Sequence, residues 1–175
     1  MGTSYPLSEA LEKLIENCMS QGDDFGKAYS RLRPYWRDEA SFATLEAKWA
    51  DNESRDKRKR SKAVDMNKKQ IVGKEIPPRR VWDLYSNRVV PWWYRVPQDS
   101  DLPLRGVWPL SHAWVFANER VGVTSPINGF EWPVPIPRDS SLERVRIELL
   151  NLGAEYAWLD VLCLRQAGGR MRWCA

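Results

Sequence analysis

The chain has 175 residues, of which 43% are hydrophobic and 11% aromatic, and its net charge is +4. This apolar content excludes a chain that is disordered throughout, because it is enough to bury a core. No run approaches the roughly 18 apolar residues of a membrane span, and residues 1–6 show no secretory signal. The three cysteines share no metal-ligand spacing and His112 is the only histidine, so we expect reduced thiols and no metal site.

Three helices are predicted in the first part of the chain, residues 7–75. The first has an apolar stripe at spacings of three and four and ends near Gly22; its members are Leu7, Leu11, Leu14, Ile15 and Cys18. The second is predicted at about residues 25–32. The third starts near Asp38, and its apolar face consists of Phe42, Leu45 and Trp49.

Most of the positive charge belongs to one segment. Residues 51–80 hold eleven Lys and Arg against five Asp and Glu, a net charge of +6, whereas the rest of the chain sums to −2, sixteen against eighteen. The run Lys57-Arg58-Lys59-Arg60 matches a short nuclear-localisation pattern or a polyanion-binding patch. No aromatic residues interleave this run, so it does not indicate a platform on which nucleic-acid bases would stack. A solvated charged face, in a helix or in a disordered segment, is the commoner explanation for such a run. We therefore expect a cytoplasmic protein, with the nucleus as the alternative, and nucleic acid is not the favoured partner.

The middle region, residues 76–138, has a different composition. It contains ten of the twelve prolines and six of the ten tryptophans. Proline at this density excludes long helices, and the tryptophans indicate loops that are packed rather than extended linkers. A short strand is predicted within residues 106–114. A hairpin is predicted from residues 121–124 and 130–134, around the turn signal Asn128-Gly129.

The last region, residues 139–175, returns to regular structure. Ser140 and Glu143 fit a capping box at the start of a helix over residues 140–153, and Gly153 fits its end. The run Tyr156–Leu164 is almost continuously apolar, which is typical of a strand buried on both faces. We expect this strand to pair in parallel with the one near residues 106–112. The predicted class is α/β, with a partial parallel sheet over residues 76–175 and a helical extension over residues 1–75.

Several residues near these two strands are candidates for chemistry. Ser111 and His112 lie at the end of the first predicted strand, although a loop hydrogen bond is the commoner explanation for a lone histidine. Asp160 interrupts an apolar run, where a carboxylate is costly to bury unless it is bonded. It is either an anchor for loop amides or part of a polar site. Cys163 is predicted to be a buried, inert thiol, because as a nucleophile it would have only His112 as its base.

Two segments resemble the heterokaryon-incompatibility (HET) domain of filamentous fungi. That family has a Leu-Ser-His-x-Trp strand and a Tyr-x-Trp-Leu-Asp-x-Leu-Cys-Ile-x-Gln strand, to which Pro109–Trp114 and Tyr156–Gln166 are similar. Arg79–Pro91 and Ile127–Pro137 resemble a mushroom-type subset of the family. The resemblance covers about residues 76–170.

The resemblance implies a role in nonself recognition and programmed cell death, and a fold distantly related to the flavodoxin-like TIR domain. Some TIR relatives cleave NAD with a glutamate that follows the second strand. HET domains continue past the position of Gln166, with a Trp-Thr-x-Gln-Glu segment, whereas this chain ends nine residues later. We therefore expect a truncated, non-catalytic domain without a cofactor, NAD being the one that the resemblance suggests.

Two alternatives stay open beside this expectation. One is an NAD hydrolase in an intact form, with Asp160, Glu131 or Glu155 as its acid. The other is a nucleic-acid-binding protein that uses residues 55–62. The expected partner of a non-catalytic domain is a protein, bound through homotypic or HET-like contacts, and no membrane is expected.

The candidate site follows from the predicted sheet and the resemblance together. The carboxyl ends of neighbouring parallel strands meet at one edge of a sheet, which is where open α/β sheets bind their ligands. We expect a pocket at that edge, lined by Ser111, His112, Trp114, Asp160 and Gln166.

Overall fold

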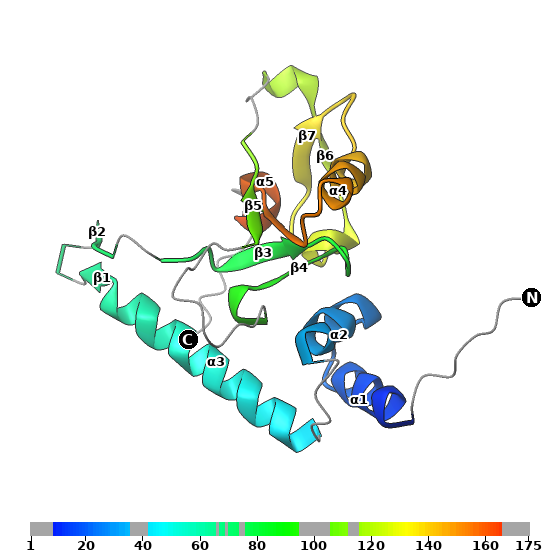
Figure 1. Ribbon diagram of the computed structural model, residues 1–175. Helices are drawn as coiled ribbons and strands as arrows, with labels where there is room; N and C mark the ends of the chain where they lie inside the picture. Colours follow the sequence, from blue (N-terminus) through cyan, green and yellow to red (C-terminus); the bar gives the residue numbers. More distant parts are fainter. Residues whose placement is uncertain are drawn as a thin grey trace, which may run out of the picture. The chain divides into compact units, whose positions relative to one another are not determined.

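A computed structural model of the chain describes residues 9–35, 42–65, 67–68, 70–73, 76–94, 106–111 and 116–165. The chain divides into two compact units. The first comprises Met1–Lys74 and Trp93–Val96, and the second comprises Glu75–Trp92 and Pro97–Ala175. The elements of each unit are labelled in Figure 1.

The first unit is mainly helical (Figure 1). Its elements are α1 (Glu9–Ser20), α2 (Phe25–Leu32), η1 (Arg33–Tyr35), α3 (Phe42–Lys62) and the short antiparallel strands β1 (Val64–Asp65) and β2 (Gln70–Ile71). The three predicted helices are confirmed. Gly22 follows α1 with a φ of +91°, a conformation that glycine adopts without strain. The described part of the third helix begins at Phe42 and includes the charged residues up to Lys62, whereas the predicted start near Asp38 lies outside the described residues. Of the two explanations for the charged segment, a solvated helix is therefore correct.

The apolar stripes of these helices meet in a small core. Its buried members are Cys18, Ala28, Leu32, Tyr35, Leu45 and Trp49. The predicted roles of Cys18, Leu45 and Trp49 are thus confirmed, whereas the side chains of Leu7, Leu11 and Phe42 lie outside what the structure describes. The Arg31 guanidinium lies 4.1 Å from the centroid of the Trp49 ring and bonds the Asp23 carboxylate at 2.8 Å. Arg31 therefore packs against the core residue Trp49 through a cation–π contact and is held there by its ion pair with Asp23.

The second unit contains a four-stranded mixed sheet. Its strands, in spatial order, are β4 (Arg88–Pro91), β3 (Arg80–Asp83), β8 (Tyr156–Trp158) and β5 (Val107–Pro109). The pairing of β5 with β8 is parallel, as predicted. The prediction of a parallel sheet is wrong for the other two pairings, because β3 runs antiparallel to both β4 and β8. The segment Arg79–Pro91 supplies this antiparallel hairpin.

A second hairpin lies outside that sheet. It pairs β6 (Arg120–Val123) with β7 (Val134–Pro137), and η3 (Ala117–Glu119) precedes it. The connection between its strands contains η4 (Pro126–Asn128) and Gly129, whose φ is +67°. The predicted hairpin is confirmed, but its second strand begins at Val134 and not at residue 130.

Helix α4 (Leu142–Asn151) ends as predicted but begins differently. Ser141 is its N-cap and makes no side-chain capping bond, so the capping box with Ser140 is wrong. At the other end, Gly153 has a φ of +82°. The Gly153 N–H donates to the Leu150 carbonyl and the Ala154 N–H to the Leu149 carbonyl, each at 2.9 Å. These two bonds form a Schellman motif and satisfy carbonyls that a helix end leaves open.

The apolar run after α4 is not one long strand. Strand β8 ends at Trp158, and the short helix α5 (Asp160–Cys163) follows. A short apolar run cannot be assigned to strand or helix by periodicity. Here its apolar side chains are buried partly in strand β8 and partly in helix α5. The core of this unit consists of Trp82, Leu84, Val89, Ile127, Val134, Ile136, Leu142, Leu149, Ala154, Ala157, Leu159, Val161, Leu162 and Cys163.

Candidate functional site

The parallel strands β5 and β8 bring two of the predicted site residues to one edge of the sheet. Pro109 is paired with Trp158, and the Leu110 N–H donates to the Trp158 carbonyl at 2.9 Å. Ser111 and Asp160 each follow this last shared position by two residues. Ser111 is exposed and Asp160 is half-buried. A hydroxyl and a carboxylate therefore lie beyond the carboxyl ends of two neighbouring strands, where ligands bind in open α/β sheets.

The other three predicted site residues, His112, Trp114 and Gln166, lie outside the described residues. A pocket shared by all five thus stays a prediction. The structure supports its geometric premise, which is the parallel pairing of β5 with β8.

Asp160 does not occupy the position in a strand that the sequence predicted. It is the first residue of α5, and its Oδ1 accepts a hydrogen bond from the Val161 N–H at 2.7 Å. The first N–H groups of a helix have no partners within the helix, so an acidic residue at this position is favourable. This bond is of the kind expected from an anchor of backbone amides.

Cys163 is a buried thiol, as predicted. Its exposed fraction is 2%, and burial raises the pKa of the thiol from 9.0 to about 11. The thiolate is the nucleophilic form of cysteine, and at neutral pH a thiol with this pKa remains protonated. The structure therefore assigns Cys163 to the core and not to chemistry.

A cluster around Trp132 was not found from the sequence. The Trp132 indole N–H donates to the Val161 carbonyl at 3.1 Å, and the Asn128 side chain donates to the Trp132 carbonyl at 2.8 Å. The Arg80 guanidinium lies 4.9 Å from the Trp132 ring centroid and bonds Glu131 at 3.1 Å. These contacts connect the β6–β7 loop to β3 and α5. They also occupy the carboxylate of Glu131, one of the acids that a hydrolase could use.

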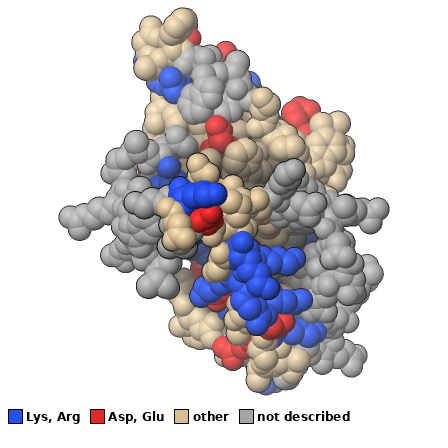
Figure 2. All heavy atoms as spheres, turned by 90° about the vertical axis from the view of Figure 1, so that its left-hand side faces the viewer, with Lys and Arg blue, Asp and Glu red and all other residues tan. Residues whose placement is uncertain are grey.

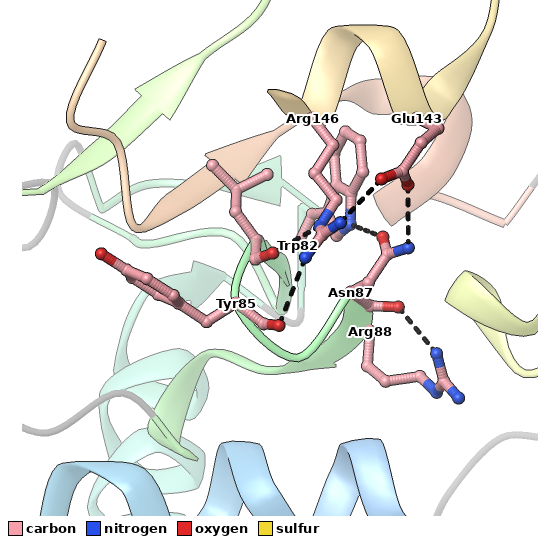
Figure 3. Close-up of polar contacts among 7 residues, drawn as sticks. Trp82, Tyr85, Asn87, Arg88, Glu143 and Arg146 are labelled. Atoms are coloured by element: carbon pink, nitrogen blue, oxygen red, sulfur yellow. Dashed lines mark hydrogen bonds and ion pairs between the residues drawn. The ribbon is translucent and has the colours of Figure 1, made fainter. Parts of the chain in front are cut away.

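A second polar cluster holds the turn between β3 and β4 (Figure 3). Arg146 on α4 donates from Nε to the Leu84 carbonyl at 2.6 Å and bonds Glu143 at 2.8 Å. The Asn87 amide donates to the Glu143 carboxylate at 3.4 Å and accepts from the Trp82 indole N–H at 3.0 Å. Hydrogen bonds and one ion pair thus fix the side chains of this cluster, which are those of Arg146, Glu143, Asn87 and Trp82.

The same turn is also held from its own strand. The fully buried Asp83 accepts hydrogen bonds from the N–H groups of Tyr85 and Ser86 at 3.0 and 3.4 Å. Asn87 has a φ of +53°, a conformation that asparagine tolerates better than most residues. An aspartate that starts a turn and an asparagine in the left-handed region are sequence signals that would have predicted this hairpin.

The densest part of the basic segment, residues 55–62, is a feature of the first unit. It lies on the second half of α3, and Figure 2 shows lysine and arginine side chains gathered on one face of the molecule. Six cations in residues 55–62, with Asp56 as the one acid, give this half-helix a net charge of +5.

No described helix is long and apolar enough to cross a membrane. Among the residues that the structure describes, no group of three or more His, Cys, Asp or Glu side chains could hold a metal ion.

Comparisons of the chain with protein-family models, with curated proteins and with solved structures found no match.

Proposed function

We propose that residues 76–175 belong to a HET-type domain and that the protein acts in fungal nonself recognition and programmed cell death. The parallel pairing of β5 with β8 carries this proposal. Strand β5 ends at Pro109, the first residue of the segment Pro109–Trp114, and β8 begins the segment Tyr156–Gln166. The carboxyl ends of both strands reach one edge of the sheet. The finer fold that we propose is TIR-like and flavodoxin-like, with β3 and β4 as an antiparallel addition to it.

In this proposal the chain acts by binding other proteins in the cytoplasm, through homotypic or HET-like contacts, and not by catalysis. Two of the three acids that a hydrolase could use make structural bonds: Glu131 with Arg80, and Asp160 with the Val161 N–H. The second unit also exposes large apolar side chains, among them Phe116 at 78% and Phe130 at 62%. Exposed aromatic side chains are enriched at protein interfaces, which supports a binding role.

Inducible expression in a filamentous fungus tests the proposed role. We expect arrested growth and uptake of a viability dye after induction of the full chain. Ala157→Asp should abolish the effect, because Ala157 is fully buried in β8 and an unpaired charge there would disrupt the sheet. Ala117→Asp is the matched control at an exposed position. Normal growth with the unchanged chain, or death with Ala157→Asp at equal protein level, would contradict the proposal.

The enzymatic alternative has its own test. Purified chain is incubated with NAD, and nicotinamide release is followed by chromatography. We expect no release above that of a sample without protein. Release that is lost in Glu131→Gln, Glu155→Gln or Asp160→Asn would replace the binding role with hydrolysis and would name the acid.

A further inference from the structure

Helix α3 carries a stripe of cations along one face of its second half. Arg55, Arg58, Lys59 and Lys62 lie at positions i, i+3, i+4 and i+7. Residues at these spacings share one face of an α-helix, and at 1.5 Å per residue the stripe is about 10 Å long. The fold thus aligns charges that the sequence shows only as a dense basic run.

Three of the cations in this half of the helix are neutralised by acids one turn earlier. Arg60 bonds Asp56 at 2.7 Å, Lys57 bonds Glu53 at 3.0 Å and Arg55 bonds Asp51 at 3.1 Å; the side chains of Arg60 and Asp56 are each only 15% exposed. These pairs are oriented with the acid on the N-terminal side, which is the favourable order.

Three other cations of this half-helix have no acidic partner among the described residues. Arg58, Lys59 and Lys62 are exposed, and within the described part of the chain none of them has an ion pair. They lie on the stripe, so the charge that no acid pairs with is concentrated on one face of the helix. Exposed like charges this close together repel one another, and a polyanion would relieve that repulsion.

We propose that this face of α3 binds the phosphate backbone of double-stranded nucleic acid without reading its bases. This inference concerns the first unit and goes beyond the proposed role of the second. Arginine, lysine and serine side chains commonly donate hydrogen bonds to phosphate oxygens, and the exposed Ser54 and Ser61 lie beside the stripe. An α-helix of about 10–12 Å diameter fits the DNA major groove, which is about 12 Å wide.

Single strands and lipid surfaces fit this face less well. Binding of single strands relies on aromatic side chains that stack on bases, and a helix at a lipid surface needs an exposed apolar face. Among the described side chains of α3, no large hydrophobic residue is exposed, and its apolar residues Leu45 and Trp49 are buried in the core of its own unit. The exposed Ile71 and Val72 lie beyond the helix, and they are the reason for a lipid arm in the experiment.

The experiment measures fluorescence anisotropy of labelled DNA and RNA duplexes of about 20 base pairs, of the same sequence, titrated with the full chain over a range of salt concentrations. Three phosphate contacts predict a slope of about −2.7 in log K against log salt, or an affinity about 40-fold lower at 200 mM than at 50 mM salt. The two duplexes tell whether DNA, RNA or both supply the phosphates. Vesicles of anionic phospholipid form the lipid arm.

The decisive variant is Arg58→Gln/Lys59→Gln/Lys62→Gln. It should bind at least about tenfold more weakly at 50 mM salt and lose most of the salt slope. The matched control, Arg79→Gln/Arg144→Gln/Arg165→Gln, removes the same charge from exposed positions elsewhere and should bind as the unchanged chain does.

A milder variant keeps the test informative if the triple variant unfolds by circular dichroism. Arg58→Gln/Lys62→Gln leaves Lys59 as the one cation of the stripe without an ion pair among the described residues, and the slope of this variant should be about −0.9. Three results would overturn the proposal. These are duplex binding that survives in both variants, an equal loss of binding in the matched control, and binding to vesicles without binding to either duplex.

Discussion

The bonds that Arg146 makes to the β3–β4 turn allow a direct test of the second unit. Arg146→Met removes the bond of 2.6 Å to the Leu84 carbonyl and keeps most of the aliphatic side chain. Leu84 is fully buried, so its carbonyl would lose a charged donor in a place that water reaches poorly. A hydrogen bond to a charged group contributes about 1.5–3 kcal/mol. The ion pair with Glu143, whose side chain is 53% exposed, adds less than about 1 kcal/mol.

We therefore expect Arg146→Met to lower the free energy of unfolding of this unit by about 2 kcal/mol, measured by urea denaturation. Arg144→Met is the matched control, because Arg144 lies on the same helix and is exposed. Hydrogen exchange of the Tyr85 and Ser86 amides should accelerate in the first variant alone, since the turn that holds them opens more often. If the two variants differ by less than about 0.5 kcal/mol, the range of ordinary surface substitutions, the assigned role of Arg146 is refuted.

Three further predictions concern single positions of the second unit. Gly153→Ala should lower the free energy of unfolding by roughly 1–2 kcal/mol, because the φ of +82° strains an L-residue although no atom lies within 4 Å of the added Cβ; an unchanged urea midpoint would contradict this. The buried Cys163, with a pKa raised from 9.0 to about 11, keeps its proton in the folded chain while the unfolded chain loses it, so stability should fall as the pH rises from 9 to 11. Cys163→Ala should make that fall smaller, as urea titrations at several pH values would show. Asp160→Asn should lower stability by about 1 kcal/mol and leave death of the fungal cells intact, because the carboxylate bonds the Val161 N–H; lost activity at unchanged stability would assign Asp160 to the site.

Local signals predicted the elements that depend on local physics. The apolar stripe through Cys18 and the glycines Gly22 and Gly153 located helices and their ends correctly, because each acts within a turn or two of the chain. The parallel pairing of β5 with β8 was also predicted, since a helix between two apolar segments favours a crossover connection. Leu152 is an exception. Its spacing from Leu142, Val145 and Leu149 predicts that it belongs to the apolar face of this helix, but it is 64% exposed because the chain leaves the helix at that residue.

The missed features depend on contacts that are distant in sequence. Nothing local indicates that Arg80 would meet Glu131, fifty-one residues later, or that the Trp132 indole would bond the Val161 carbonyl. The sequence predicts one strand after Tyr156, because a short and largely buried helix has the same apolar composition and periodicity does not distinguish the two. Asp160 is the residue that favours a helix here over a continuous strand, since an acidic residue is common at the start of a helix and costly inside a buried strand.

The change from strand to helix at Asp160 alters the reasoning about the candidate site. A carboxylate inside a buried strand is costly unless it is bonded, either as an anchor for loop amides or as part of a polar site, and that cost is one argument for a site. At the start of α5 the carboxylate has a structural partner in the Val161 N–H, so the argument from cost no longer applies. What supports the site now is the register of β5 and β8, which brings Ser111 and Asp160 to one edge. A shift of the pairing by one residue would turn every side chain of the shifted strand to the opposite face of the sheet. The site hypothesis therefore depends on a backbone alignment, and a variant that shifts that register should be more damaging to function than the loss of either side chain alone.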